Sequence, residues 1–396
     1  MRRLLLGIAS AAVLAVGGPS GTAPAAEANF YEPPSPLPTT QPGALLRAEP
    51  LTFRGSAKPA DGTVGYRIMY VSTSAMGAPV AVSGTLLLPD DSKVARPLVG
   101  FAPGSHGMGD QCAPSRQLSG GSEQEMGTLR RLLADGNAVV MTDYEGLGTP
   151  GTHPFAVNVA AGRDVLDSIR AARQVQGTGL QPDGRIGLFG YSQGGGAVGS
   201  AAEQAPSYAP ELKPVGAVVG GVLGEPARLP QNLFGNFWAG VVLFAVIGYD
   251  SAYPELQLKP ELSQFGRNAL STTGKSCIVQ AGIPLQYAHM NWFTKRFGNP
   301  IASAKWKKRM LENTLGYGKP AIPIYQYHGE WDQVLNYNSA LRVRSRWCQQ
   351  GVDVTFTKIM FAEHFLAQPW ALDGAAKWMQ ARLAGEPAPR GNCPAV

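Results

Sequence analysis

The sequence predicts an α/β protein with a mainly parallel sheet, helices on both faces and a mostly helical insertion. Short apolar segments bounded by Gly and Pro, as in buried parallel strands, alternate along the chain with segments of helical periodicity. This alternation is interrupted between about residues 225 and 312, where strand-like patterns are scarce and aromatic residues are frequent. With 396 residues, 44% hydrophobic and 16% charged, the chain can bury a sizeable core.

The start of the chain has the pattern of a secretory signal peptide. Two arginines at positions 2 and 3 precede an apolar run at residues 4–16, and small residues then offer cleavage after Ala25 or Ala28. This run is too short to span a bilayer, and so is the next most apolar segment, residues 237–247. We therefore expect a secreted, extracellular protein without a transmembrane segment in its mature chain.

Three parts of the chain follow from these patterns. Residues 1–28 are the predicted signal peptide, residues 29–224 and 313–396 the α/β core, and residues 225–312 a helical cap, or lid, inserted into it. The formal charge of +6 is spread over the chain without a dense Lys/Arg block, so nucleic-acid binding is not expected. Nothing in the composition favours a particular oligomeric state.

The core elements are predicted in order from the periodicity of each segment. Residues 29–60 are rich in proline, and we expect an extended arm lying over the domain. Strands are predicted at residues 65–72, 80–88, 97–102, 138–142, 185–189, 215–219, 322–327 and 352–358. Helices are predicted at residues 123–134, 159–175, 337–349 and 374–384, and directly after Gly194.

The segment Gly190-Tyr191-Ser192-Gln193-Gly194 fits the G-x-S-x-G nucleophile elbow. A serine hydroxyl is a weak nucleophile, so it must stand clear of the sheet where a base and an acyl carbonyl can reach it. Glycines at 190 and 194 remove side chains that would collide where a strand turns sharply into a helix. A tight turn whose serine only caps the helix is the alternative interpretation.

An elbow serine needs a histidine base, and in folds of this kind the chain order is serine, acid, histidine. The chain has five histidines. His106 and His153 precede the serine, His289 lies in the insertion, and His328 ends a strand before any plausible acid. His364, in the loop after the last predicted strand, is therefore the predicted base.

The acid is expected in the loop that follows the strand at residues 322–327. Glu330 and Asp332 are the candidates there. We predict Asp332, because such loops usually bring the carboxylate several residues beyond the strand, whereas Glu330 suits a surface position. Asp143 precedes the serine, so a structural role is expected for it.

Two backbone N–H groups must stabilise the oxyanion, and each contributes on the order of 3 kcal/mol to the transition state. Gln193, which follows the nucleophile, is the first predicted donor. The second is expected from the loop at residues 103–107, where Gly104, Ser105 and His106 are the candidates and Ser105 is our choice.

Four cysteines in an exported chain favour two disulfides, and no C-x-x-C spacing indicates zinc. Three pairings are possible. A bond between Cys348 and Cys393 would pin the Pro/Gly-rich tail to a late helix, and Cys112 with Cys277 would then join an early loop to the insertion.

The chain resembles the secretory lipases of the fungal lipase A type and their actinobacterial relatives, within the α/β-hydrolase superfamily. The resemblance covers nearly the whole mature chain. It rests on NFYEPPSPLP with PGALLRAEP, FAPGSHGMGDQCAPS, TDYEGLGTPGTHPF, GYSQGGGA, YHGEWDQVLNY and the late His364. It implies a triad of Ser192, Asp332 and His364, a helical cap over the site, a tunnel for an acyl chain, and disulfides Cys112–Cys277 and Cys348–Cys393.

The chain departs from the family pattern in two places. Asn336 stands where the family often has a proline shortly after the catalytic aspartate, and the oxyanion loop has a PGSHG form unlike the fungal one. These departures leave the triad intact and bear on the substrate preference and on the second oxyanion donor.

These observations predict a secreted serine carboxylester hydrolase that cleaves lipid esters, acylglycerols such as triacylglycerols among them, through an acyl-enzyme on Ser192. We expect a lipid or other ester as substrate, transient contact with a lipid interface, and neither a metal nor an organic cofactor. The alternatives are an acyltransferase that uses the same triad, a peptidase, and a non-catalytic binding module of the same fold.

Overall fold

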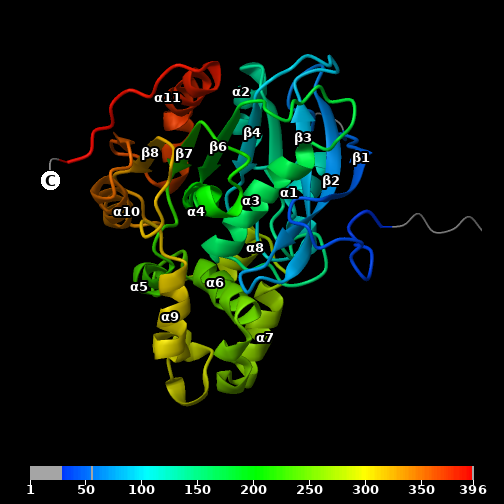
Figure 1. The fold of residues 1–396 in the computed structure, drawn as a ribbon. Helices are drawn as coiled ribbons and strands as arrows, with labels where there is room; N and C mark the ends of the chain where they lie inside the picture. The colour runs from blue at the N-terminus through cyan, green and yellow to red at the C-terminus, as the bar shows by residue number, and fades with distance from the viewer. Residues whose placement is uncertain (1–28, 55–56, 395–396) are drawn as a thin grey trace, which may run out of the picture.

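The computed structural model describes residues 29–54 and 57–394, so the predicted signal peptide lies outside the described residues. Within this part of the chain, nine strands form one sheet in the order β1-β2-β3-β5-β4-β6-β7-β8-β9 (Figure 1). The neighbours from β5 through β4 to β9 are parallel, and β1, β2 and β3 join antiparallel at one edge. The predicted mainly parallel sheet is therefore confirmed.

In the parallel part, strands β4 to β8 are short and buried along their whole length, as their apolar runs predicted, whereas β9 at the edge is only partly buried. The nine strands are β1 Leu45–Pro50, β2 Val64–Thr73, β3 Pro79–Leu88, β4 Leu98–Ala102, β5 Ala138–Thr142, β6 Ile186–Tyr191, β7 Gly216–Gly220, β8 Ile324–Gly329 and β9 Val354–Ile359. Strand β1 corrects the expectation of an extended arm through residue 60, because it pairs with β2 from Leu45 to Pro50. The proline-rich run at residues 33–42 ends before this strand begins, and Pro50 is only its last residue.

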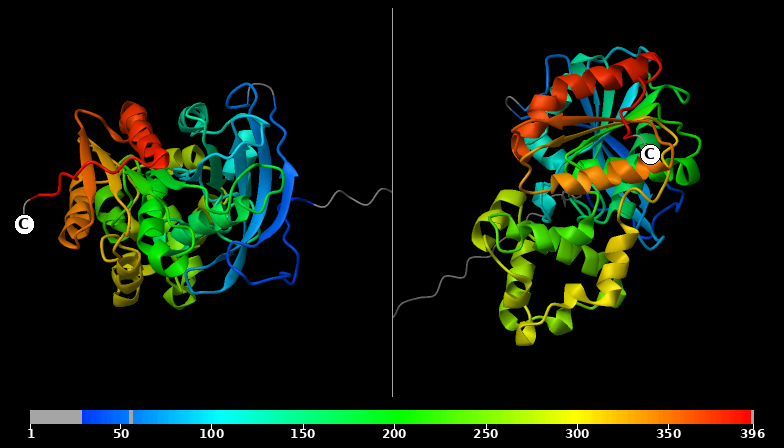
Figure 2. Two further views of the ribbon diagram at one scale, coloured as in Figure 1. Left: turned by 45° about the horizontal axis from the view of Figure 1, so that its top comes forward. Right: turned by 90° about the vertical axis from the view of Figure 1, so that its left-hand side faces the viewer.

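Helices cover both faces of the sheet, as expected (Figure 2). They are α1 Pro114–Gly120, α2 Met126–Ala134, α3 Asn158–Ala172, α4 Gln193–Tyr208, α10 Tyr337–Gln349 and α11 His364–Ala384. Apolar side chains of α3, α4 and α10 form one core with one face of the sheet, and those of α1, α2 and α11 form a second core with the other. Alternate residues of the buried strands therefore serve different cores, which explains their continuous apolar character.

Helix α11 begins ten residues earlier than the predicted 374–384. His364 is its first residue rather than part of a loop, and Glu363 caps it by accepting hydrogen bonds from the backbone N–H groups of Phe365 and Leu366. Pro369 lies inside this helix and supplies no N–H. The cap fixes the start of the helix despite the proline, so His364 stands on a rigid element.

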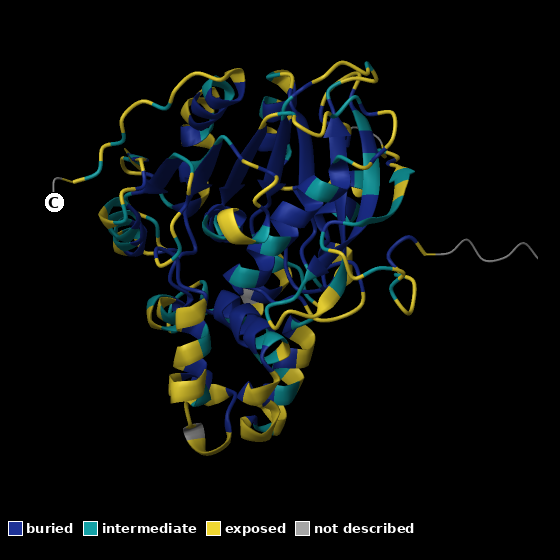
Figure 3. Cartoon of the chain, in the orientation of Figure 1, coloured by how far each residue is buried: buried dark blue, intermediate teal, exposed yellow. Residues whose placement is uncertain are grey.

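Between β7 and β8 the chain forms a separate helical segment, residues 226–312, gathered at one end of the α/β part (Figures 1 and 2). Its helices are α5 Leu229–Leu233, α6 Ala239–Ala252, α7 Gln264–Thr273, α8 Ile278–Gly282 and α9 Ala304–Glu312, joined by short 3-10 turns. Helix α6 is buried along most of its length, while α7 and α9 carry exposed surface (Figure 3). The apolar core around α6 includes Phe155 and Val157 from the α/β part, so the segment is anchored to it.

None of the helices in the described ranges combines the length and the apolar character needed to cross a membrane.

Two disulfides tie distant parts of the chain together. Cys112 in the turn after β4 is bonded to Cys277 at the start of α8, and Cys348 on α10 is bonded to Cys393 in the C-terminal tail. These are the pairs that the family resemblance implies. The first joins the core to the helical segment, and the second joins the C-terminal tail to α10.

Removing the second disulfide is expected to lower stability without affecting chemistry. In the double variant Cys348→Ser, Cys393→Ser, freeing a 45-residue loop should cost about 4 kcal/mol in the free energy of unfolding. Urea unfolding measures this loss, and ester hydrolysis at 25 °C should stay close to wild type. An unchanged unfolding midpoint would mean that the hydrogen bonds of Asn392 with Val354 and Phe356 hold the tail by themselves.

Candidate active site

The predicted nucleophile Ser192 lies in the sharp turn between β6 and α4. Its backbone is in the left-handed region, with φ 60° and ψ −120°. Such a conformation costs a non-glycine residue roughly 1–3 kcal/mol, so it persists only where the surroundings enforce it. Hydrogen bonds from Ser192 N–H to Gly220 O (3.1 Å) and from Gly196 N–H to Ser192 O (3.1 Å) hold the turn in place.

The two glycines of the elbow have the steric role that the motif predicts. A Cβ on Gly190 would lie 2.3 Å from Gly194 O, and a Cβ on Gly194 would lie 1.9 Å from Ala102 O. Both obstacles are backbone atoms, which cannot swing aside as a side chain can. The absence of side chains at these positions therefore lets α4 begin directly against the end of β4.

The structure brings Ser192, His364 and Asp332 together in one hydrogen-bonded chain. Ser192 Oγ lies 2.9 Å from His364 Nε2, and His364 Nδ1 lies 2.6 Å from Asp332 Oδ2. Because a carboxylate only accepts, Nδ1 carries the proton and donates it to Asp332, which leaves Nε2 to accept from the serine hydroxyl. His364 is also fixed through its backbone, where its N–H donates to Gln333 and its C=O accepts from Tyr191 OH.

Asp332 is held as an anion by its surroundings. Its Oδ1 accepts hydrogen bonds from the N–H groups of Val334 (2.9 Å) and Leu335 (2.7 Å), and His328 Nε2 lies 3.2 Å from its Oδ2. Burial raises the pKa of this carboxyl. The charge of His364 and the hydrogen bonds from His328 and His364 have a larger, opposite effect, so the pKa of Asp332 lies well below its usual range. The other candidate acid, Glu330, forms a salt bridge with Lys358 at 2.8 Å, outside this chain of contacts.

The candidate oxyanion donors lie on two neighbouring segments. Gln193 is the first residue of α4, where backbone N–H groups lack an intrahelical acceptor. In the loop after β4, the N–H of Gly104 donates to Glu125 Oε1 at 2.9 Å and is therefore already engaged. For Ser105 and His106, no acceptor of the backbone N–H lies among residues 29–54 and 57–394, so both remain candidates.

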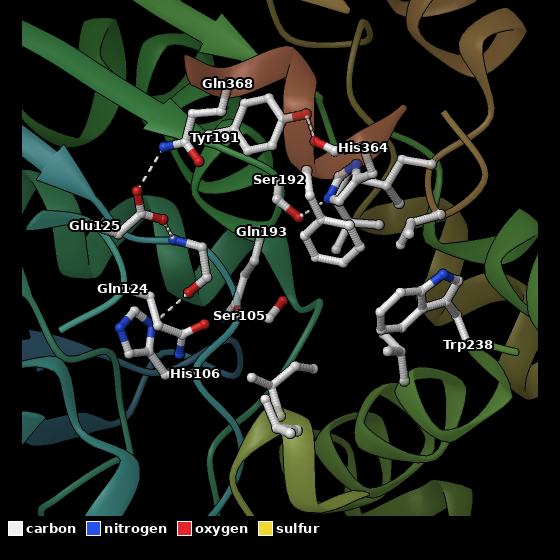
Figure 4. Close-up of a pocket in the computed structure, with 18 of the residues that line it drawn as sticks. Ser105, His106, Gln124, Glu125, Tyr191, Ser192, Gln193, Trp238, His364 and Gln368 are labelled. Carbon is white, nitrogen blue, oxygen red and sulfur yellow. Dashed lines mark hydrogen bonds between the residues drawn. The ribbon is translucent and has the colours of Figure 1, made fainter. Parts of the chain in front are cut away.

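Ser192 opens into a cavity of about 610 Å³ between the sheet and the helical segment (Figure 4). Figure 4 shows Ser192 directed at His364, with Trp238 and Glu125 on opposite sides. The polar side chains that line the cavity include Gln124, Glu125, Thr128 and Gln368. Its apolar lining consists of Phe155, Leu223, Leu229, Phe237, Trp238, Val241, Ile278, Val279, Val334, Leu335, Phe365, Pro369 and Leu372.

Two histidines that chain order excluded as the base nevertheless lie buried beside the candidate oxyanion donors. His106 is hydrogen-bonded to Gly104 and Glu123, and His153 to Gln193. Both occur in motifs noted for the family resemblance, PGSHG and GTHPF. The sequence patterns considered these histidines only as candidates for the base and did not predict these contacts. Asp143 accepts from Ser83 and Ser115, which matches the structural role expected for it.

The fold and the Ser-His-Asp geometry define an α/β-hydrolase. A family model described as secretory lipase matches residues 115–391. The chain therefore belongs to the secretory lipase family and is a lipase-like carboxylic ester hydrolase.

Curated relatives are similar along most of their length. Lipase A of Arthroderma benhamiae is 28% identical over 384 residues, which cover 91% of this chain and 80% of the relative. A secreted triacylglycerol lipase of Malassezia furfur is 28% identical over 358 residues, 86% of this chain and 72% of the relative. A Mycobacterium tuberculosis protein named a probable inactive lipase is 29% identical over 373 residues, 90% and 82% of the two chains.

Solved structures agree on the fold. Candida antarctica lipase A in its closed state superposes with a TM-score of 0.83 at 23% identity, covering 92% of this chain and 87% of that one. The rice cell wall degrading esterase LipA of Xanthomonas oryzae gives 0.68 at 18% identity, covering 87% and 97%.

The close approach of Gly194 to Ala102 predicts that Gly194→Ala displaces the elbow. Activity should fall by ~100-fold or more, since a shift of about 1 Å in the nucleophile has such an effect, and the unfolding midpoint should fall too. Gly120→Ala in α1 is the matched control, because a Cβ there meets nothing within 4 Å. Ester hydrolysis and thermal unfolding measure both variants. Wild-type values for Gly194→Ala would mean that the backbone around Ala102 relaxes readily.

Proposed function

We propose that the protein is a secreted serine carboxylester hydrolase that cleaves lipid esters such as triacylglycerols through an acyl-enzyme on Ser192. The observation that carries this proposal is the chain of contacts from Ser192 Oγ to His364 (2.9 Å) and on to Asp332 (2.6 Å), beside a largely apolar cavity. A nucleophile, a base and an orienting anion in that geometry are the parts that acyl transfer requires.

The reaction follows from the donors and acceptors of these groups. His364 Nε2 takes the proton of Ser192 as its Oγ attacks the ester carbonyl, and the resulting imidazolium is stabilised by the Asp332 anion. The imidazolium then protonates the departing alcohol, which leaves an acyl-enzyme. Water enters, gives a proton to His364 Nε2 and attacks the acyl carbon, and the carboxylic acid is released as Ser192 regains its proton.

We assign the oxyanion to the backbone N–H groups of Gln193 and Ser105. Gln193 lies at the start of α4, where the helix dipole also favours negative charge. Ser105 follows Gly104, whose N–H is engaged by Glu125, and precedes His106, whose C=O accepts from Ile278 N–H. Its own N–H therefore belongs to a loop that is fixed on both sides.

We propose that residues 225–312 act as a cap that binds the acyl chain over the α/β core of residues 29–224 and 313–396. Leu229, Phe237, Trp238 and Val241 of this segment line the cavity together with Leu223 and Phe155 of the core. An apolar wall of this extent favours a long or bulky acyl group, since each buried CH₂ contributes about 0.8 kcal/mol.

Export and contact with a lipid surface complete the proposal. The signal-peptide pattern of residues 1–28 and the two disulfides suit an oxidising extracellular location. On the segments around β9 and the start of α11, each residue of a group that we call the aromatic patch is at least 43% exposed. The patch consists of Trp331, Met360, Phe361, Phe365, Leu366 and Trp370. Phe365 of the patch also lines the cavity, so docking on lipid would bring the ester to the entrance.

Triad variants test the catalytic assignment. Ser192→Ala should lower kcat on a soluble p-nitrophenyl ester by about 10⁶-fold. Asp332→Asn should lower it by about 10⁴-fold, because His364 would no longer be held in the tautomer with its proton on Nδ1. An organophosphonate should label Ser192 of the wild type, as detected by mass spectrometry.

Other outcomes would point elsewhere. A folded wild type that is neither labelled nor active would favour a non-catalytic binding module; the Mycobacterium tuberculosis relative is named a probable inactive lipase. Preferential formation of a new ester in the presence of added alcohol would favour an acyltransferase.

The aromatic patch predicts a difference between soluble and aggregated substrates. Trp370→Ser should weaken binding to triacylglycerol emulsions several-fold while leaving hydrolysis of a soluble short-chain ester unchanged, because Trp370 does not line the cavity. Trp292→Ser is the matched control, since Trp292 is similarly exposed (51% against 57%) but lies on the 3-10 turn Met290–Trp292 of the helical segment. Equal losses in both variants would contradict a specific role for the patch.

A further inference from the structure

His106 and His153 are fully buried beside the two segments that carry the proposed oxyanion donors. His106 lies in the loop with Ser105, and His153 contacts the side chain of Gln193. Neither histidine lies in the hydrogen-bonded chain of Ser192, His364 and Asp332. Their hydrogen-bond partners differ in kind, and this difference determines their protonation.

His106 has an acceptor at each ring nitrogen. Its Nδ1 lies 2.9 Å from Gly104 O, and its Nε2 lies 2.9 Å from Glu123 Oε1. A neutral imidazole carries one proton and can satisfy only one of these acceptors, so the geometry calls for the doubly protonated imidazolium. Burial lowers the pKa of His106, but the charge and hydrogen bond of Glu123 and the hydrogen bond to Gly104 raise it more, to about 9.

This imidazolium and Glu125 hold Gly104 from both sides. His106 Nδ1–H donates to Gly104 O, while Gly104 N–H donates to Glu125 Oε1. Glu125 is itself anchored, because its Oε2 accepts from Gln368 of α11 at 2.6 Å. Fixing the backbone of Gly104 also fixes the peptide that follows it, whose N–H belongs to Ser105.

His153 has one acceptor and one donor. Its Nδ1 lies 3.0 Å from Glu145 O, so Nδ1 carries the proton, and its Nε2 lies 2.9 Å from Gln193 Nε2, so Nε2 accepts from that amide. This arrangement requires a neutral ring. Burial and the charge of His106 lower the pKa of His153, to about 4, against a smaller opposing effect of Glu145 O.

Tyr144 links the two sides. Its ring stacks on His153 with centroids 5.6 Å apart, and its OH donates to Pro103 O at 2.7 Å, at the start of the loop that carries Ser105. Tyr144 thus contacts the loop through Pro103 and contacts His153, the partner of Gln193.

We propose that His106 and His153 are positioning residues of the oxyanion hole, His106 as an imidazolium that fixes the Gly104–Ser105 peptide and His153 as a neutral imidazole that fixes Gln193. This inference rests on the proposed function, because it takes Ser105 and Gln193 as the donors. Each histidine acts on its donor through the intervening contact and touches no reacting atom.

The charged groups around each ring give the proposal a pH signature. Glu123, Glu125 and Asp143 face His106, and His106 and the Glu145 carbonyl face His153. Above about pH 9, His106 loses a proton. The Glu123 carboxylate is the stronger acceptor and retains Nε2–H, so Nδ1 becomes a lone pair opposed to Gly104 O. The proposed triad mechanism does not by itself predict a loss of activity above about pH 9.

Kinetics as a function of pH test the His106 role. For a soluble short-chain ester followed by pH-stat, kcat should fall above about pH 9 with little change in KM. His106→Ala should lower kcat by ~100-fold at pH 8, as loss of one oxyanion donor does. His106→Asn keeps a donor near the position of Nδ1 but does not titrate, so it should retain most activity and show no alkaline fall. His289→Asn, at an exposed histidine, is the matched control and should keep the wild-type profile.

The role of His153 is tested in the same way. His153→Ala should lower kcat at least 10-fold at unchanged KM, and His153→Gln, whose amide oxygen can accept from Gln193, should restore part of the loss. Nitrogen NMR of the histidine rings in the wild type measures their protonation directly and does not depend on whether the variants fold. At pH 7.5, His106 should have two protonated nitrogens, and His153 should be neutral with its proton on Nδ1.

Several results would overturn the proposal. They are a neutral His106 or a charged His153 at pH 7.5, an alkaline fall that persists in His106→Asn, and Ala variants that change KM rather than kcat. Failure of the proposed function would look different from failure of this inference. In that case Ser192→Ala would keep wild-type turnover, or the wild type would have no turnover at all. The NMR result tests the two rings in either case.

Discussion

The site depends on one steric constraint, the contact between the start of α4 and the end of β4. Gly194 lies so close to the Ala102 carbonyl that no side chain fits between them. This contact places the start of α4 next to the loop after β4, and Ser192, Gln193 and Ser105 line the same cavity. The strained serine backbone costs free energy, which the buried parallel strands on either side offset through their packing. Backbone sterics thus contribute to the positions of the proposed nucleophile and of the two proposed oxyanion donors, independently of any charged group.

Three buried histidines then show how hydrogen-bond partners determine charge. His364 lies between a carboxylate and a hydroxyl, His106 between a carboxylate and a carbonyl, and His153 between a carbonyl and an amide N–H. The same side chain is therefore poised to gain a proton in the first case, charged in the second and neutral in the third. Burial alone would make all three neutral, so the specific acceptors around each ring decide the outcome.

The sequence predicted what local patterns encode. Apolar runs located eight of the strands, and the elbow motif with chain order singled out Ser192, Asp332 and His364. It failed where tertiary contacts decide. Strand β1 exists because β2 offers an edge for pairing, and α11 starts at His364 because Glu363 caps it. Among the candidates for the second oxyanion donor, Gly104 is engaged by Glu125, a residue 21 positions away. The partners of His106 and His153 likewise come from other elements, and no periodicity reveals such contacts.

The helical segment is joined to the loop at residues 103–107, which carries the proposed donor Ser105, by a disulfide and by backbone hydrogen bonds nearby. Cys277 at the start of α8 is bonded to Cys112, and the adjacent backbone pairs with the loop through Ile278 N–H to His106 O and Met108 N–H to Ser276 O, both 2.9 Å. A movement of α8 away from the core would pull on the loop that carries Ser105. A movement that left the proposed oxyanion geometry unchanged would have to involve other contacts of the helical segment. Such a contact joins Trp238 of the helical segment to Phe365 of α11, whose ring centroids lie 4.9 Å apart. A ring contact of this kind can open by side-chain rotation, whereas the α8 side is held by a covalent bond and two hydrogen bonds.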